Sequence, residues 1–222
     1  MRIAIASCLF AVGFGLTSSL PAIASDAEFQ WRPENGEALD FKVLRNGNEF
    51  GYHTVEFSVE NDQIEVTNDI ELKVSMGPLR LFYYRHESEE VWKDGQLHTM
   101  NGETRKDGDT LTMTVQKAED ALKVSGSGFD GEVSPMIIPS SHWNIQQVKS
   151  DKILSSENGE ILEVSVEDLG QEEIQTENGT ILANRFRMVS DLTVDLWYDE
   201  SGRWVKCAFV ARDQNIEYVL KS

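Results

Sequence analysis

The sequence predicts an all-β fold: a single antiparallel meander of about ten to thirteen strands, curved into an open or closed β-barrel and crossed by one short helix. Two observations predict it. Apolar residues recur with a period of two rather than 3.6, and turn-forming dipeptides separate the apolar runs at regular intervals. Asn and Asp tolerate a positive φ and Gly adopts it freely, so these pairs reverse twisted strands. They are Asn46-Gly47, Asn61-Asp62, Asp94-Gly95, Asp107-Gly108, Asn158-Gly159, Asn178-Gly179 and Ser201-Gly202.

The first 24 residues are predicted to be a signal peptide rather than part of the fold. Arg2 gives a short positive region, residues 3–20 are mostly apolar, and Ala22-Ile23-Ala24 is an A-x-A cleavage site. The alternative is a membrane anchor, but glycines and a Thr-Ser-Ser triplet interrupt the apolar run, and a span needs about 20 clean apolar residues. We therefore expect export, cleavage after Ala24 and no membrane span in the mature chain. Residues 25–37 would form an N-terminal arm and residues 38–222 the β domain.

The composition of the chain disfavours some classes of binding partner and excludes an internal disulfide. The formal net charge is −18 over 222 residues, which disfavours nucleic acid and anionic membrane surfaces as partners. An acidic balance also keeps an exported β protein soluble, and we expect a monomer. Removing the leader leaves Cys207 as the single cysteine, so no internal disulfide forms. Cys207 lies in an alternating apolar run and is predicted to be a small buried side chain rather than a nucleophile.

The strands are predicted on both sides of an insert at residues 135–149. The clearest one covers residues 64–76, where Asn68 alone interrupts the apolar parity, and a reversal of parity predicts a bulge near Gly51. The other predicted strands cover residues 38–45, 49–60, 79–92, 97–105, 110–116, 121–127, 160–169, 172–177, 180–190, 192–198, 203–212 and 216–220.

The insert at residues 135–149 is the segment where the period of two fails. Ser140-Ser141 can cap a short helix over residues 142–148. About eight strands close a barrel that side chains fill, so a larger curved sheet must enclose a cavity, flatten or be plugged. The inward parity is apolar, which predicts an apolar cavity with the insert as its lid or plug.

Ligand contacts are predicted at the insert and at one polar-aromatic cluster. Met136, Ile138 and Trp143 are expected to point into the barrel mouth; the alternative is that Trp143 seals one end of the core. Arg187 and Asp195 should lie close together, either as a buried pair at the base of the cavity or as a surface pair. The predicted ligand-binding residues are Met136, Ile138, Trp143, Arg187, Asp195, Trp197 and Trp204.

Catalytic and metal motifs are absent from the sequence. The four histidines show no metal-ligand spacing, and no nucleophile elbow, P-loop or dinucleotide fingerprint occurs. We predict no metal, no cofactor and no catalytic residue. His142, with Asp195 or Asp199, is the one catalytic candidate, because its imidazole lies in the non-repetitive segment.

Several segments resemble an exported bacterial family of uncharacterised periplasmic β domains. They are Ser141-His142-Trp143-Asn144, Glu157-Asn158-Gly159-Glu160, residues 191–199 with Gly202-Arg203-Trp204-Val205, Ala211-Arg212 and Ile216-Glu217-Tyr218. The resemblance implies a periplasmic location. More distantly, the chain is similar to the half-open barrels of lipoprotein-localisation factors, which hold acyl chains in an apolar concave sheet. It implies no known activity.

Three functions remain open on the sequence. The first is non-catalytic binding of a lipid or other hydrophobic small molecule inside the curved sheet, where each buried CH₂ contributes about 0.8 kcal/mol. The second is an interaction or assembly role with an envelope protein, in which the core is packed shut. The third is a hydrolase or isomerase that uses His142.

Overall fold

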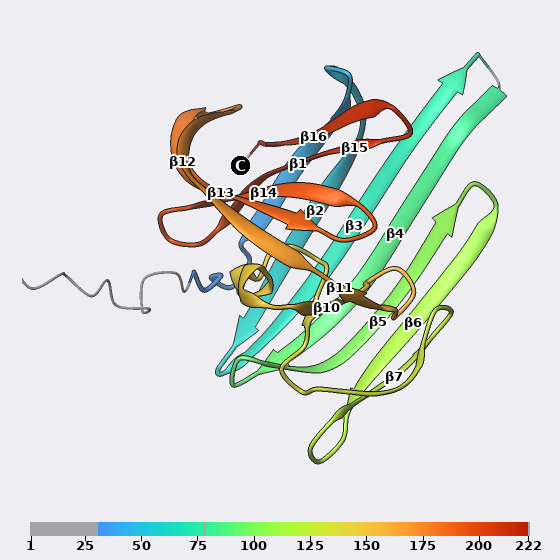
Figure 1. The fold of residues 1–222 in the computed structure, drawn as a ribbon, viewed down its shortest axis with the longest axis vertical. Helices are drawn as coiled ribbons and strands as arrows, with labels where there is room; N and C mark the ends of the chain where they lie inside the picture. Colours follow the sequence, from blue (N-terminus) through green and yellow to red (C-terminus); the bar gives the residue numbers. More distant parts are fainter. Residues whose placement is uncertain (1–30, 78, 222) are drawn as a thin grey trace, which may run out of the picture.

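The computed structural model describes residues 31–77 and 79–221, and within them the protein is all-β (Figure 1). The predicted leader and the start of the predicted arm lie outside the described residues. The strands are β1 (Ala38–Arg45), β2 (Asn48–Glu60), β3 (Gln63–Met76), β4 (Leu79–Lys93), β5 (Gln96–Lys106), β6 (Asp109–Lys117), β7 (Leu122–Gly126), β8 (Asp130–Val133), β9 (Ile138–Pro139), β10 (Lys152–Leu154), β11 (Ile161–Glu163), β12 (Ser165–Thr176), β13 (Gly179–Val189), β14 (Thr193–Asp199), β15 (Trp204–Ala211) and β16 (Gln214–Leu220).

Thirteen of these strands form one curved antiparallel sheet, in the order β12-β13-β14-β15-β16-β1-β2-β3-β4-β5-β6-β7-β8. Its outer strands β8 and β12 do not pair with each other, so the sheet is open and the alternative of a closed barrel is wrong. The single meander also needs correction. The chain runs from β1 to β8, leaves the sheet, and returns as a second meander whose last strand, β16, pairs with β1. This pairing covers the edge that β1 would otherwise expose.

The turn and bulge predictions are confirmed where hairpins form. Asn46 and Gly47 have φ values of 48° and 80°, and Asp94 and Gly95 have 51° and 73°. Val43 pairs with Gly51 and Leu44 with Glu49, so Phe50 is the extra residue of a bulge. One turn was missed: Arg212 and Asp213 adopt φ values of 49° and 60° without the Gly or Asn that signals such a turn.

The predicted helix over residues 142–148 is only a 3-10 turn, η1 (Ile145–Lys149). Its N-cap is Asn144, whose side chain accepts a hydrogen bond from the Gln146 amide, and not the Ser140-Ser141 pair. Ser140 instead accepts a 3.0 Å hydrogen bond from the Ser156 amide. The correction has a local reason: Asn144 is itself a strong capping residue, placed one turn later.

The insert, extended by β9–β11, covers the concave face of the sheet (Figure 1). Strands β9, β10 and β11 form a separate small sheet, in which β9 and β10 are parallel. Trp143 anchors the insert, because its ring packs edge-on against Phe57 of β2 and Trp92 of β4 at centroid distances of 5.5 and 5.4 Å.

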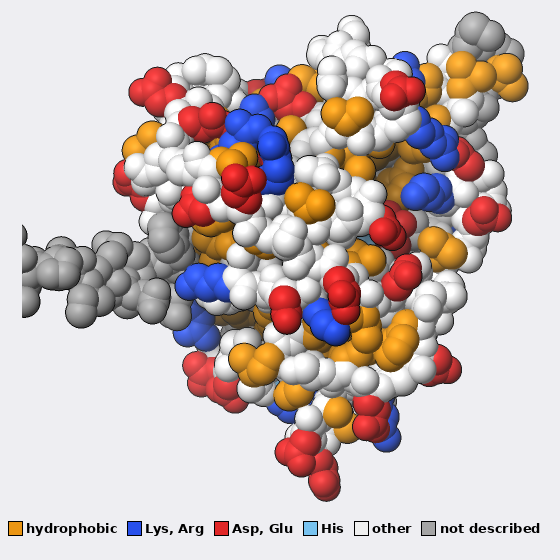
Figure 2. Space-filling view, viewed as in Figure 1, with side chains coloured by type: hydrophobic (Ala, Val, Ile, Leu, Met, Phe, Trp, Pro, Cys, Tyr) orange, Lys and Arg blue, Asp and Glu red, His pale blue; other side chains and the backbone are white. Residues whose placement is uncertain are grey.

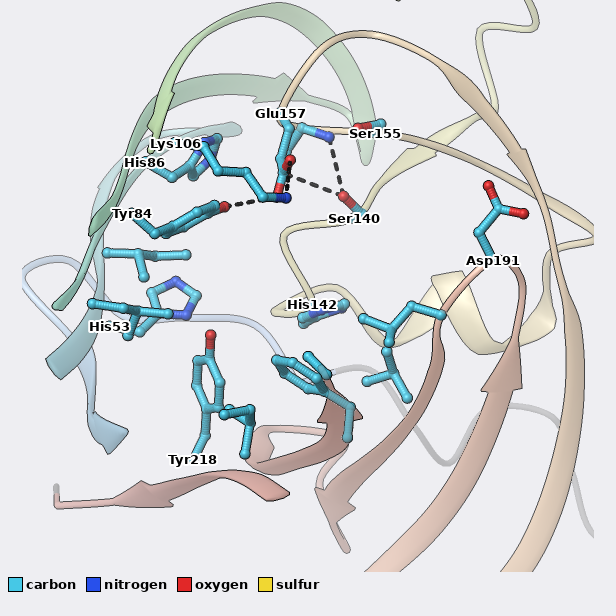
Figure 3. Close-up of a pocket in the computed structure, with 18 of the residues that line it drawn as sticks. His53, Tyr84, His86, Lys106, Ser140, His142, Ser155, Glu157, Asp191 and Tyr218 are labelled. Carbon is cyan, nitrogen blue, oxygen red and sulfur yellow. Dashed lines mark hydrogen bonds and ion pairs between the residues drawn. The ribbon is translucent and has the colours of Figure 1, made fainter. Parts of the chain in front are cut away.

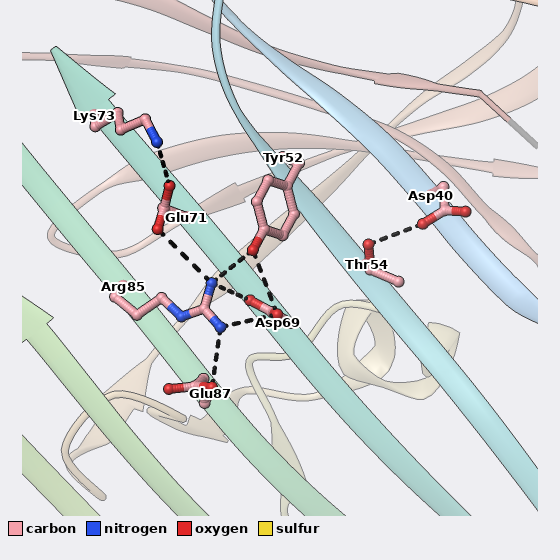
Figure 4. Close-up of polar contacts among 8 residues, drawn as sticks. All are labelled: Asp40, Tyr52, Thr54, Asp69, Glu71, Lys73, Arg85 and Glu87. Atoms are coloured by element: carbon pink, nitrogen blue, oxygen red, sulfur yellow. Dashed lines mark hydrogen bonds and ion pairs between the residues drawn. The ribbon is translucent and has the colours of Figure 1, made fainter.

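The convex face carries the polar parity of the long strands, as predicted (Figure 4). Arg85 of β4 donates to the Tyr52 hydroxyl at 2.6 Å and to Asp69 of β3 at 3.0 Å. Neighbouring pairs join Lys73 to Glu71 at 2.7 Å. These half-exposed contacts contribute little individually; their importance is that they fix which parity of β3 and β4 faces inward.

Two further segments complete the fold. The described part of the arm packs on β2, with Trp31 edge-on to Phe57 at 5.3 Å and the Val59 amide donating to Asn35. The β12–β13 hairpin bends back toward β16, where the Glu177 amide donates to the Leu220 carbonyl at 3.1 Å. Cys207 is buried, as predicted, and burial raises the pKa of its thiol.

Candidate functional site

A cavity of about 980 Å³ lies between the concave face of the sheet and the insert. On the face shown in Figure 2, hydrophobic side chains are visible in hollows between charged residues. The apolar wall of the cavity comes from both meanders, so neither half of the chain forms it alone. It includes Ile70 and Leu72 of β3, Phe82 of β4, Val194 of β14, Phe209 of β15 and Ile216 of β16.

Three imidazoles line this cavity (Figure 3): His53 of β2 and His86 of β4, which are buried, and His142 of the insert, which is half-buried. His53 and His86 are 3% and 2% exposed. Burial lowers the pKa of His53 to about 3 and that of His86 to about 4, and it also lowers the pKa of His142. All three rings are therefore uncharged near neutral pH.

His142 is held by a hydrogen-bonded chain that fixes its tautomer. Its Nδ1 lies 3.0 Å from the Gln147 side-chain oxygen, and the Gln147 Nε2 donates to the Tyr198 hydroxyl at 2.7 Å. The Tyr198 hydroxyl in turn donates to the His142 carbonyl at 2.9 Å. Since the Gln147 oxygen can only accept, His142 carries its proton on Nδ1, and its Nε2 is left as a hydrogen-bond acceptor.

His53 is different, because within the described residues neither of its ring nitrogens has a hydrogen-bond partner. Burial and the neighbouring His142 lower the pKa of this ring, and the Asn68 side chain acts in the opposite direction. The ring lies among aromatic side chains, with centroids 5.3 Å from Trp204 and 5.8 Å from Tyr218. A buried imidazole without partners costs free energy, so a ligand that bonds to it would be favoured.

The polar wall continues through the side chains around Glu157 (Figure 3). The Tyr84 hydroxyl donates to Glu157 at 2.9 Å, and the Lys106 ammonium lies 3.9 Å from the other carboxylate oxygen. The Ser140 and Ser156 hydroxyls are 3.1 Å apart. Glu157 and Lys106 carry opposite charges, so this end of the cavity presents hydrogen-bonding groups with no excess charge.

Behind this wall lies a buried carboxyl, Glu90 of β4, which is 1% exposed. Its Oε2 accepts from the Trp92 and Trp143 indoles at 2.7 and 3.0 Å, and its Oε1 accepts from the Asn68 amide at 3.3 Å. Burial raises the pKa of Glu90. Because Asn68 also lines the cavity, Glu90 and its partners support the cavity wall from behind.

None of the seven predicted ligand-binding residues lines this cavity. Met136 is 64% exposed, whereas Ile138 is 7% and Trp143 5% exposed in the core. Trp143 therefore has the packing of a residue that seals the core end, which was the alternative. Trp204 is fully buried and contacts the cavity indirectly, with its ring 5.3 Å from His53 and 5.5 Å from His142.

Arg187 and Asp195 lie directly opposite each other on β13 and β14, and the Arg187 Nε donates to Asp195 at 2.8 Å. They project from the face opposite Val194, which lines the cavity, so they are not a pair at its base. Arg185 also donates to Asp195, at 2.6 Å, and its guanidinium lies over the Trp197 ring at 5.0 Å. This is a structural cluster on the outer face of the second meander.

His142 lines the cavity, but neither predicted carboxylate partner is hydrogen-bonded to it. Asp195 is occupied by the two arginines, and Asp199 accepts from the Ser201 hydroxyl and the Arg203 side chain within its own turn. Within the described residues, no group of three or more His, Cys, Asp or Glu side chains is placed to hold a metal ion. No helix in that part of the chain is long and apolar enough to cross a membrane.

The sequence prediction missed His53, His86 and Tyr218 as site residues. One signal was present. The inward parity of β4 begins with Phe82 and Tyr84 but continues with His86, Ser88 and Glu90. Polar residues on the inward parity of a long strand indicate either a packing network or a site, and here both are present.

Curvature, open edges and an interior cavity define the chain as a β-barrel-like protein. It belongs to the family described as "Domain of unknown function (DUF6134)", which matches residues 41–221. The predicted resemblance to a family of uncharacterised β domains is confirmed at this level. No curated protein matches the chain. A solved structure, titled "Crystal Structure of Beta-barrel-like Protein of Domain of Unknown Function DUF1849 from Brucella abortus", is similar with a TM-score of 0.59 at 7% identity, covering 82% of this chain and 94% of that one. At that identity the likeness shows the fold alone.

Proposed function

We propose that the mature protein is a non-catalytic carrier or sensor that holds a hydrophobic small molecule, such as a lipid, in the cavity under the insert, and that it does so in the bacterial periplasm. The observation that supports this best is the cavity itself: about 980 Å³, with apolar side chains from β3, β4 and β14–β16 along one wall. Ligand pockets of about 300–1,000 Å³ with mainly apolar walls are typical of small-molecule sites. The predicted leader supports the location.

The interaction role fits the interior less well. It was predicted for a concave face packed shut, whereas this face is open over a large volume. The catalytic alternative lacks the carboxylate partner that His142 would need, because Asp195 and Asp199 are bonded elsewhere. The binding role requires only shape, an apolar wall and a few polar groups, all of which the described residues supply.

The test is binding of an uncharged hydrophobic fluorophore, N-phenyl-1-naphthylamine, together with native mass spectrometry of gently purified protein. We expect saturable fluorescence enhancement and a co-purifying lipid mass. Ala211→Phe should reduce the number of bound probe molecules, because Ala211 lines the cavity. Ala118→Phe is the matched control, since residue 118 lies in the β6–β7 turn outside the cavity. Lipid-free protein that does not bind the fluorophore would refute the proposal.

A further inference from the structure

The charged side chains that line the cavity balance one another. Three are cationic and three are carboxylates: Arg45, Lys106 and Arg212 against Glu157, Glu160 and Asp191. Several are already paired, since Lys106 lies 3.9 Å from Glu157 and Arg212 3.4 Å from Asp107. The charges therefore cancel over the wall as a whole, although Arg45, Glu160 and Asp191 belong to no ion pair among the described residues.

The deepest polar groups of the cavity are uncharged and have hydrogen-bonding capacity to spare. His53 is 3% exposed, and within the part of the chain that the structure describes both of its nitrogens are without partners. The His142 Nε2 is an acceptor, because Nδ1 carries the proton that bonds to Gln147. The Tyr218 side chain lies beside His53 on the same wall (Figure 3). The two imidazoles together offer one donor and two acceptors to a ligand.

We propose that the site selects ligands whose polar head is uncharged and both donates and accepts hydrogen bonds, such as a long-chain alcohol or a monoacylglycerol, with the head against His53 and His142 and the chain along the apolar wall. This inference rests on the proposed binding function and names its ligand class. A hydroxyl head satisfies the His53 imidazole in either tautomer, because a hydroxyl is both donor and acceptor.

Ionised heads are disfavoured by desolvation. A carboxylate or an ammonium that leaves water for this end of the cavity loses its hydration, and such a loss is offset only by a close, hydrogen-bonded countercharge. The imidazoles of His53 and His86 supply no positive charge at pH 8, because burial lowers their pKa values to about 3 and about 4. Of the two carboxylates that act on His86, Glu157 lines the cavity, and the Tyr84 hydroxyl and Lys106 already bind it.

The experiment compares three ligands of equal chain length at pH 8: dodecanol, dodecanoate and dodecylammonium, each displacing N-phenyl-1-naphthylamine from the purified mature protein. We expect dodecanol to bind at least about tenfold more tightly than either ion. Binding of dodecanoate or dodecylammonium within threefold of dodecanol would overturn the inference while leaving the proposed function intact. If the fluorophore itself does not bind, the proposed function fails first, and the inference with it.

A variant pair tests the role of His53. His53→Leu should weaken dodecanol about fivefold, because a hydrogen bond worth about 1 kcal/mol is removed, while the affinity for N-phenyl-1-naphthylamine stays within twofold. His98→Leu is the control, since His98 lies on β5 outside the cavity. Unchanged dodecanol binding in His53→Leu would overturn the assigned contact. If His53→Leu does not fold, His53→Gln is measured instead; it should retain most of the dodecanol affinity, because its side-chain amide both donates and accepts, and a fivefold loss would overturn the assigned contact.

Discussion

Removing the buried carboxyl of Glu90 is expected to destabilise the protein in a way that separates hydrogen bonding from charge. Glu90→Leu leaves the Trp92 and Trp143 indole N–H groups without their acceptor, and it removes one of the two acceptors of the Asn68 amide. Each orphaned buried donor costs about 1–3 kcal/mol, so we expect a loss of roughly 3–5 kcal/mol in the free energy of unfolding. At this chain length that corresponds to a fall in Tm of about 10 °C.

Glu90→Gln keeps an oxygen for the two indoles, and the Asn68 amide can rotate to accept from the new NH₂ group. We therefore expect this variant to lie within about 1 kcal/mol of the wild type at pH 5. Its pH dependence provides the sharper test. Because burial raises the pKa of Glu90, the folded protein holds this proton more tightly than the unfolded chain does.

The sign of that pH dependence follows directly. The stabilisation from the bound proton is complete below the ordinary carboxyl value of 4.5 and is lost as pH rises through the folded-state pKa. Glutamine has no such proton, so Glu90→Gln should gain stability relative to the wild type between pH 5 and pH 8. Urea unfolding followed by tryptophan fluorescence at both pH values measures the difference. Two results would refute the role given to Glu90: a decrease below about 1 kcal/mol in the free energy of unfolding of Glu90→Leu, or a Glu90→Gln variant that becomes less stable relative to the wild type as the pH rises.

The remaining predictions concern three other positions. Gly51→Ala should destabilise the protein by more than about 3 kcal/mol in urea unfolding, because the added Cβ would lie 2.0 Å from the Glu71 carbonyl oxygen; a near-neutral effect would show that the bulge can shift. Asp195→Asn should cost only about 1 kcal/mol at pH 7, since Arg187 is 39% exposed. Hydrogen bonds from Arg187 lower the pKa of Asp195, so the stabilisation by its carboxylate is fully present above pH 3.8. The difference in unfolding free energy between the wild type and Asp195→Asn should therefore narrow as the pH falls through the folded-state pKa of Asp195; a difference that widens on acidification contradicts the pairing. The Cys207 thiol, whose pKa burial raises, should resist iodoacetamide at pH 8 in native protein and react in urea, as mapped by peptide mass spectrometry; rapid native alkylation would place it at the surface.

Much of the sheet could be predicted because its signals are local. Where Asn-Gly or Asp-Gly forms the turn of a hairpin, as at Asn46-Gly47, two adjacent residues are enough to predict the turn. The long strand β3 shows its inward parity clearly in the sequence. In β2, the change of parity at Phe50 marks the bulge. The pairing of β16 with β1 is different, because it joins residues such as Val43 and Tyr218 that are far apart in the sequence. No local sequence pattern specifies which edge strand of the first meander will pair with the second meander.

The site was harder to predict because its residues follow the same period as the core. His53 shares its parity with Val55 and Phe57. From a single sequence, a histidine among apolar residues of one strand face can be interpreted either as a core residue or as a site residue. Of the insert residues named from the sequence, His142 lines the cavity, whereas Met136, Ile138 and Trp143 do not. Trp143 was predicted to contact a ligand because its ring is large and amphipathic. In the structure its indole N–H donates to Glu90 and its ring packs in the core.

Strand β4 gives the strongest physical reason to regard the polar end of the cavity as more than packing. Its convex parity carries Arg85 and Glu87, while its concave parity carries His86, Ser88 and Glu90, so the middle of the strand is polar on both faces. Such a strand in the centre of a thirteen-stranded sheet adds little apolar burial, and each inward polar group must find a partner. Glu90, the side-chain nitrogen of Asn68 and His86 do find partners, the last through Thr104 at 2.8 Å, whereas the side-chain oxygen of Asn68 does not. His53, on the neighbouring part of the same wall, does not. The unpartnered groups of this network, the Asn68 oxygen and the His53 imidazole, belong to residues that line the cavity, and such an arrangement has the form of a site completed by a ligand.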